Sequence, residues 1–255
     1  MRILGSSSTT RTRWAFIGCA PGGRCAWSGA AACPPRGCGG GGSGPRAESP
    51  APARARSCTA RSPRATTSCG FPTGADVHHI AQQVSRNVRV AYVDKDPMVV
   101  AHGRALLEGD GQTAVVQADL RDPVAMLREP RLAHLIDLSQ PVAVLIVSVL
   151  HCVPDADDPH NAVRQAIDRL APGSFIAISH LASDDADAAH DVSRFMRRAT
   201  DWGRVRERQE IDRFFDGLHV LSPGLGDVGL WNDTPHTGQR RGHGWIEYGG
   251  VARVP

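Results

Sequence analysis

The sequence lacks the short motifs that identify the commonest enzyme classes. It contains no G-x-S-x-G elbow, no P-loop and no H-E-x-x-H, which argues against the usual serine hydrolases, nucleoside triphosphatases and zinc metalloproteases. None of its seven cysteines shows the C-x-x-C spacing of a zinc site. The chemistry must therefore be sought in the arrangement of ordinary residues.

Long apolar runs are also lacking. The longest, residues 142–150, is far shorter than the roughly 20 residues that cross a bilayer. No secretory signal is present, because the polar run SSSTTRTR occupies the place of an apolar core near the start. We therefore expect a cytoplasmic protein with no membrane partner.

Residues 1–69 have few of the side chains that build a core. They include only four Leu, Ile, Val or Phe residues, together with ten Arg and a single acid, Glu48. Such a segment cannot bury enough apolar surface to offset its ordering entropy, so the composition predicts disorder over 1–69 and a folded domain over 70–255. A basic tail that binds nucleic acid is the alternative. We expect no nucleic-acid partner, because aromatic interleaving and helical periodicity are missing.

The remainder of the chain alternates between strands and helices. Apolar runs predict strands at residues 88–93, 113–118, 141–150 and 174–179, and amphipathic segments between them predict helices. The run 141–150 has no polar alternation, as expected for a central strand that is covered on both faces. This order predicts a doubly wound, mostly parallel α/β sheet.

Two acids follow successive predicted strands. Asp94 ends the run VRVAYVD, and Asp119 ends TAVVQAD. Ligands of such sheets bind beyond the carboxyl ends of the strands, where carboxylates accept hydrogen bonds from ribose hydroxyls or an adenine amine. Alternatively, Asp94 or Asp96 only caps the following helix, which begins with Pro97.

Other polar groups have simpler interpretations. The acids of residues 155–158 precede a proline and predict a turn and a helix start, so we expect no metal site. His78 and His79 are interpreted as a surface pair. His151 lies where a substrate group could bind, although a structural histidine fits equally well. Cys152 is expected to be a buried, inert thiol.

Several motifs together resemble a known family. FPTGADVHHIAQQV, VAYVDKDPMVVAHGRALL, TAVVQADLRDP, PVAVLIVSVLHCVPD and LAPGSFIAISH, with the closing YGGVARVP, resemble the actinobacterial-type S-adenosyl methyltransferases over residues 70–254. The resemblance implies a class I, Rossmann-like methyltransferase fold with an antiparallel last strand, and S-adenosylmethionine as methyl donor. It also implies a small-molecule methyl acceptor.

The resemblance further implies a cofactor site. Asp94 is the expected ribose-binding acid with Lys95 beside it, and Asp119 with Leu120 is the expected adenine-binding pair. Ser148 and Val149 are expected beside the methionine portion, and Gly70 at the glycine turn. No residue is assigned a catalytic role, because positioning donor and acceptor supplies much of the rate of a methyl transfer.

One motif departs from the family pattern. Where the family has a strand that ends in D-x-G-x-G, this chain has residues 66–70, of which only Gly70 matches. We therefore expect a sheet without a proper first strand, and we interpret residues 1–69 as an out-of-frame translation, a hypothesis that resequencing tests.

The sequence thus predicts a methyltransferase that acts on an unidentified acceptor. One alternative is an inactive relic or S-adenosylmethionine sensor of the same fold. The second is an NAD-dependent oxidoreductase, ranked last because no G-x-G-x-x-G turn leads into the strand that ends at Asp94.

Overall fold

The computed structural model describes residues 13–17, 76–198, 202–231 and 245–255. The chain divides into two compact units, residues 1–23 with 66–255, and residues 24–65. All described residues belong to the first unit, which is the one considered below.

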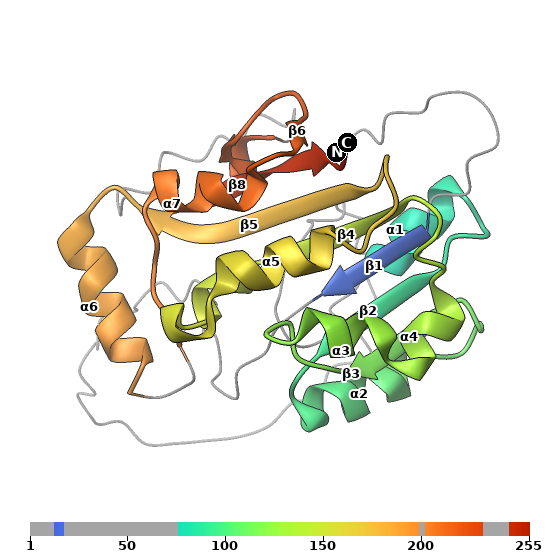
Figure 1. Ribbon diagram of the computed structural model, residues 1–255. Helices are drawn as coiled ribbons and strands as arrows, with labels where there is room; N and C mark the ends of the chain where they lie inside the picture. Colours follow the sequence, from blue (N-terminus) through green and yellow to red (C-terminus); the bar gives the residue numbers. More distant parts are fainter. Residues whose placement is uncertain (1–12, 18–75, 199–201, 232–244) are drawn as a thin grey trace, which may run out of the picture. The chain divides into compact units, whose positions relative to one another are not determined.

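The described residues form an eight-stranded sheet in the order β3-β2-β1-β4-β5-β8-β6, and β7 pairs with β8 outside that path (Figure 1). Neighbouring strands from β3 to β5 are parallel, whereas β6, β7 and β5 all run antiparallel to β8. The strands are β1 (Arg13–Ile17), β2 (Val90–Asp94), β3 (Thr113–Gln117), β4 (Val142–Val147), β5 (Phe175–Ser183), β6 (His219–Val220), β7 (Gly226–Asp227) and β8 (Trp245–Arg253).

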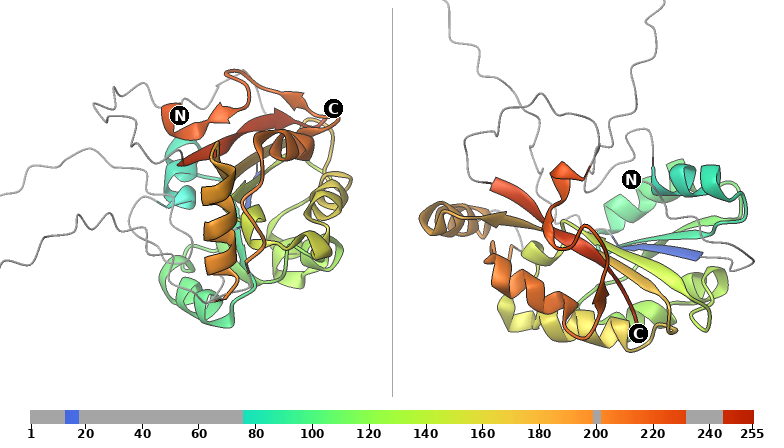
Figure 2. Two further views of the ribbon diagram at one scale, coloured as in Figure 1. Left: turned by 90° about the vertical axis from the view of Figure 1, so that its left-hand side faces the viewer. Right: turned by 90° about the horizontal axis from the view of Figure 1, so that it is seen from above.

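Helices cover both faces of this sheet. Seen from above, α1 lies on one face, and α5 and α7 lie on the other (Figure 2). The α-helices are α1 (Val77–Val84), α2 (Pro97–Leu107), α3 (Pro123–Arg128), α4 (Pro130–Leu135), α5 (Pro159–Ile167), α6 (Ala186–Met196) and α7 (Arg208–Asp212). Short 3-10 helices are η1 (Leu150–Cys152), η2 (Asp155–Asp157), η3 (Arg213–Phe215) and η4 (Val228–Leu230). The doubly wound α/β fold predicted from the sequence is confirmed.

Aspartate–proline pairs set the starts of three helices. Asp96, Asp122 and Asp158 each accept a hydrogen bond from a backbone N–H of the first turn, and each is followed by a proline at the first helical position. The first N–H groups of a helix have no acceptor within the helix. A carboxylate cap accepts a hydrogen bond from one of them, and a proline at the first position has no N–H that requires an acceptor. These caps fix where the chain turns after β2, β3 and β4.

The structure corrects one part of the fold prediction. The sheet was expected to lack its first strand, yet β1 lies between β2 and β4, where Trp14 pairs with Val90 on one side and Ala143 on the other. Both neighbours have a row of backbone groups that requires a partner, and the apolar run of β1 supplies it. The rest of residues 1–69 lies outside the described residues, so their disorder and the domain boundary at Gly70 stay predictions.

The core is continuous across the middle of the sheet. Val142, Val144 and Ile146 of β4 are almost fully buried and pack with Ile176 and Ile178 of β5. Within the described ranges, no helix is long and apolar enough to span a membrane.

Candidate functional site

Asp94 is the last residue of β2 and lies at the carboxyl edge of the sheet. Its side chain is buried, and its Oδ1 accepts a hydrogen bond from the backbone N–H of Asp96 at 2.9 Å. Asp96 instead caps α2, because its own Oδ1 accepts from the N–H of Met98 at 2.8 Å. The two acids therefore have separate roles, and Asp94 is not the helix cap. Lys95 lies between them and is half-buried.

Asp119 lies close to Asp94 in the fold. The backbone N–H of Ala118 donates to the carbonyl of Asp94 at 3.1 Å, so Asp119 follows directly after the last contact between β2 and β3. Arg121 donates to Asp119 Oδ2 from Nε at 2.9 Å and from its terminal nitrogen at 2.6 Å. Partial burial acts to raise the pKa of Asp119, but the hydrogen bonds from Arg121 outweigh it and the pKa is lowered. The carboxylate is therefore held ionised and oriented.

Leu120 and Val149 are core residues. Both side chains are buried in the main apolar cluster, with 6% and 2% of their surface exposed. The structure therefore gives both residues a packing role in the core, and their expected place at the cofactor stays a prediction.

Ser148 follows β4 and has a left-handed backbone, with φ of 54°. Its hydroxyl donates a short hydrogen bond to Oε1 of Glu247, and the hydroxyl of Ser179 donates to the same oxygen at 2.7 Å. The Ser148 side chain is thus directed toward β8. Burial raises the pKa of Glu247, an effect that the two hydroxyls partly oppose.

His151 and His180 are both buried. His151 Nδ1 accepts from the backbone N–H of Leu181 at 3.3 Å, and its ring lies 4.7 Å from that of Trp202. Burial, followed by the charge of Arg206, lowers the pKa of His151 to about 3. His180 lies 2.7 Å from the Leu181 carbonyl through Nδ1 and 3.2 Å from an Arg206 nitrogen through Nε2. These contacts support the structural interpretation of His151, and they give His180 a structural role as well.

Arg206 is 1% exposed and organises the loop after β4. It donates to the carbonyls of Leu150 at 2.6 Å and Val153 at 2.9 Å, and to Asp155 Oδ1 at 2.6 Å. Arg206 was not among the residues predicted from the sequence. The run GRVRER contains three similar arginines, and nothing local marks the buried one.

The acids of residues 155–158 each have a structural contact. Asp155 pairs with Arg204 and Arg206, Asp157 pairs with Arg121, and Asp158 caps α5. The predicted turn and helix start are confirmed for Asp158 and Pro159.

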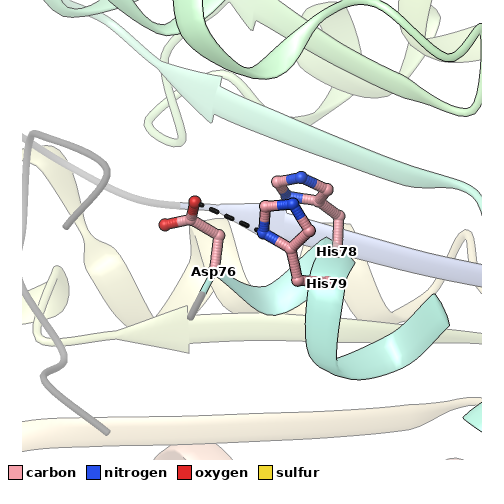
Figure 3. A group of neighbouring side chains, drawn as sticks. All are labelled: Asp76, His78 and His79. Atoms are coloured by element: carbon pink, nitrogen blue, oxygen red, sulfur yellow. Dashed lines mark ion pairs between the residues drawn. The ribbon is translucent and has the colours of Figure 1, made fainter. Parts of the chain in front are cut away.

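One other group in the described part of the chain brings possible metal ligands together. Asp76, His78 and His79 lie at the start of α1 with one ligand atom each within 4.8 Å of the others (Figure 3). His78 is buried rather than on the surface, which corrects half of the expected surface pair, and its Nδ1 lies 2.9 Å from the Tyr92 hydroxyl. These contacts tie α1 to β2, and we assign the group a structural role. The expectation of no metal stays a prediction.

Gly70, the remaining predicted cofactor residue, lies outside the described residues. Cys152 is buried, as expected.

Together, the strand order and the strand-end acids define a class of protein. The order of strands reverses at β1, so the carboxyl edge of β1 is flanked by Asp94 on one side and by Ser148 on the other. That reversal is where open α/β sheets bind their ligands. With the antiparallel strand beside β5, this is the class I methyltransferase fold.

The chain belongs to the S-adenosyl methyltransferase family, whose model matches residues 66–255. A DUF574 family protein from Streptomyces avermitilis has a similar structure, with a TM-score of 0.67 and 36% identity over 73% of this chain and 72% of that chain. A candidate methyltransferase from Thermobifida fusca also has a TM-score of 0.67 and 36% identity, over 72% of this chain and 70% of that one.

No curated protein matches the chain. The family match confirms the resemblance seen in the sequence, and it identifies S-adenosylmethionine as the methyl donor.

Proposed function

We propose that this chain transfers the methyl group of S-adenosylmethionine to a small-molecule acceptor. The observation that carries the proposal is Asp94, a buried carboxylate at the carboxyl end of β2 beside the point where the strand order reverses. When bound, S-adenosylmethionine supplies an activated methyl group. The residues of the chain hold and orient the two reactants.

The polar groups at this edge suit the chemistry of the donor. Ribose hydroxyls and the adenine amine are hydrogen-bond donors, and carboxylates are acceptors. In our proposal Asp94 accepts from the ribose, with Lys95 beside it, and Asp119 accepts from the adenine amine next to the backbone of Leu120. Ser148 and Val149 lie beside the methionine portion, and Gly70 belongs to the turn that approaches it.

Calorimetry on the full-length chain tests the proposal. We expect S-adenosylhomocysteine to bind, and Asp94→Ala to weaken its binding by about 30-fold or more, because two hydrogen bonds to a charged group are lost. Asp96→Ala is the matched control, since that acid caps α2 two residues away. Its binding constant should stay within about threefold of that of the wild type, because it removes a helix cap and no ligand contact.

Equal weakening by both substitutions would contradict the assigned role of Asp94, and absence of binding to the wild type would contradict the proposed function. Formation of S-adenosylhomocysteine with candidate acceptors then separates an enzyme from a protein that binds the cofactor without turnover.

A further inference from the structure

The strands β5 and β8 extend beyond the end of β4. The last residue of β4, Val147, pairs with Ser179, whereas β5 continues to Ser183, which pairs with Trp245 at the start of β8. This extension forms a wall beside the carboxyl end of β4. Any ligand that occupies the space beyond β4 has this wall on one side.

Glu247 lies on the wall, opposite Leu181 of β5. The hydroxyls of Ser148 and Ser179 both donate to Oε1 of Glu247. The two serines are also hydrogen-bonded to each other. The backbone N–H of Ser148 donates to the carbonyl oxygen of Ser179 at 3.1 Å and to its hydroxyl oxygen at 3.2 Å. The carboxylate is thus oriented by residues from two other strands.

The second oxygen of Glu247 has no such partner among the described residues. Across the described ranges, neither a hydrogen-bond donor nor a cation contacts Oε2. Asp119, Asp155 and Glu210 are different, since each of them pairs with an arginine. A partly buried carboxylate without a neighbouring cation destabilises the fold. We therefore interpret Oε2, which has no partner among the described residues, as the atom that binds a ligand.

The position of Glu247 relative to Asp94 indicates which ligand. Asp94 ends β2 and Ser148 follows β4, and these two strands lie on opposite sides of β1. On the proposed function the sugar of the donor lies over β2, so the transferred methyl group lies toward β4 and the wall. A group on the wall therefore faces the acceptor rather than the nucleoside.

We propose that Glu247 binds the methyl acceptor, with Oε2 accepting a hydrogen bond from the N–H or O–H group that becomes methylated. This inference rests on the proposed function and specifies its substrate class: a protic nitrogen or oxygen nucleophile without a negative charge, which a carboxylate would repel. The nitrogen or oxygen forms a bond to the methyl carbon while the carbon–sulfur bond breaks. The electrons of that bond stay on sulfur, and the acceptor proton passes to Oε2.

The environment of Glu247 suits a proton acceptor. Burial raises the pKa of Glu247, and the nearby charge of Asp227 raises it further. The hydrogen bonds from the two serine hydroxyls oppose this increase. A carboxylate is a more effective base when its pKa is closer to the working pH. Among the described residues, no charged residue of β5 or of the end of β4 contacts Glu247, and Asp227 of β7 is the charged group that acts on its pKa.

The test uses two ligands that do not require the acceptor to be known. Sinefungin carries a protonated amine where S-adenosylmethionine carries its methyl group, and S-adenosylhomocysteine carries no group there. Calorimetry on the full-length chain should show tighter binding of sinefungin, by about tenfold or more, because its ammonium is close to Oε2. Glu247→Gln keeps the shape and the serine hydrogen bonds, and it should reduce this preference below about threefold.

Asp212→Asn is the matched control, because Asp212 Oδ1 accepts from the hydroxyl of Tyr248, the next residue of β8. It should leave the preference for sinefungin unchanged. The role of Glu247 would be overturned if Glu247→Gln kept the preference for sinefungin, or if the wild type bound both ligands equally. Either result would leave the proposed function unaffected. Binding of neither ligand would overturn the proposed function together with this inference.

A second measurement covers the case in which Glu247→Gln does not fold. In the wild type the preference for sinefungin should decrease as pH is lowered through the raised pKa of Glu247. Acids that contact both ligands affect the two binding constants equally, so their protonation does not change the ratio of these constants. A ratio that stays constant from pH 8 to pH 4.5 would also overturn the role of Glu247.

Discussion

Replacing Arg206 with Met should strongly destabilise the protein. The guanidinium is almost fully buried, and it donates to two backbone carbonyls and one carboxylate. Methionine has a similar length and no donor. The substitution therefore removes the hydrogen bonds with little change in packing volume.

The magnitude follows from the groups that lose their partner. The Val153 carbonyl loses its donor, at a cost of about 1–3 kcal/mol. The Leu150 carbonyl keeps the backbone N–H of Val153 at 3.1 Å, but it loses a hydrogen bond from a charged group, which contributes about 1.5–3 kcal/mol. Asp155 is 56% exposed and returns to water at little cost. Burial lowers the pKa of Arg206, which shows that its charge is itself costly to bury, and removing that charge offsets part of the loss. We expect the free energy of unfolding to fall by about 2–5 kcal/mol, a large share of the 5–15 kcal/mol typical of a domain.

Urea denaturation followed by circular dichroism measures this change. Arg194→Met is the matched control, because Arg194 forms an exposed pair with Asp191 and its loss should cost less than about 1 kcal/mol. Arg206→Lys should give an intermediate loss, since a single ammonium does not reproduce the planar fork of a guanidinium. Equal stability of Arg206→Met and Arg194→Met would refute the view that Arg206 holds the loop after β4.

Two further substitutions test other polar contacts. Tyr92→Phe removes the hydroxyl that the backbone N–H and the Nδ1 of His78 contact at 3.1 and 2.9 Å. The substitution should lower the free energy of unfolding by about 1–2 kcal/mol in the same assay. An unchanged free energy of unfolding would show that other contacts hold α1. Hydrogen bonds from Arg204 lower the pKa of Glu210 from 4.5 to about 2. Because the pKa is lower in the folded state, the ionised carboxylate stabilises the fold above pH 4.5, and this stabilisation is lost as pH falls toward 2. Glu210→Gln should therefore show a shallower decrease of stability over this range than the wild type, and parallel pH curves would contradict the assignment.

Most of the sheet was predictable because its signals are local. The continuous apolar run of residues 141–150 contains β4, and the pair Asp96 and Pro97 marks the start of α2. The strand-end acids were predictable for the same reason, since a strand that stops at a carboxylate is visible within ten residues. Their two roles were not, because Asp94 and Asp96 look equivalent until the hydrogen bonds show that Asp96 caps the helix and Asp94 does not.

The contacts that the sequence did not reveal join distant residues. The strand β1 lies in a segment whose average composition indicates disorder, and its five residues become a strand only because β2 and β4 offer partners on both sides. The run Trp-Ala-Phe-Ile at residues 14–17 was the available signal, but it is short and lies in a segment rich in Arg and Gly. Ser148 and Glu247 are 99 residues apart, and Glu247 lies outside every motif that the sequence shares with the family.

The charge change during methyl transfer explains why a carboxylate on the wall is useful there. The positive charge of the sulfonium disappears as a positive charge develops on the acceptor nitrogen, or as a proton becomes acidic on the acceptor oxygen. A carboxylate close to the sulfur would stabilise the starting state and slow the reaction, whereas one beside the acceptor stabilises the state toward which the charge moves. Glu247 lies across β1 from Asp94, next to the end of β4, so the strand order separates the acid that would hold the sugar from the acid that would act on the acceptor. Loss of Glu247 should therefore reduce the rate of transfer more than the affinity for the donor, and the opposite pattern would place its carboxylate beside the sulfur.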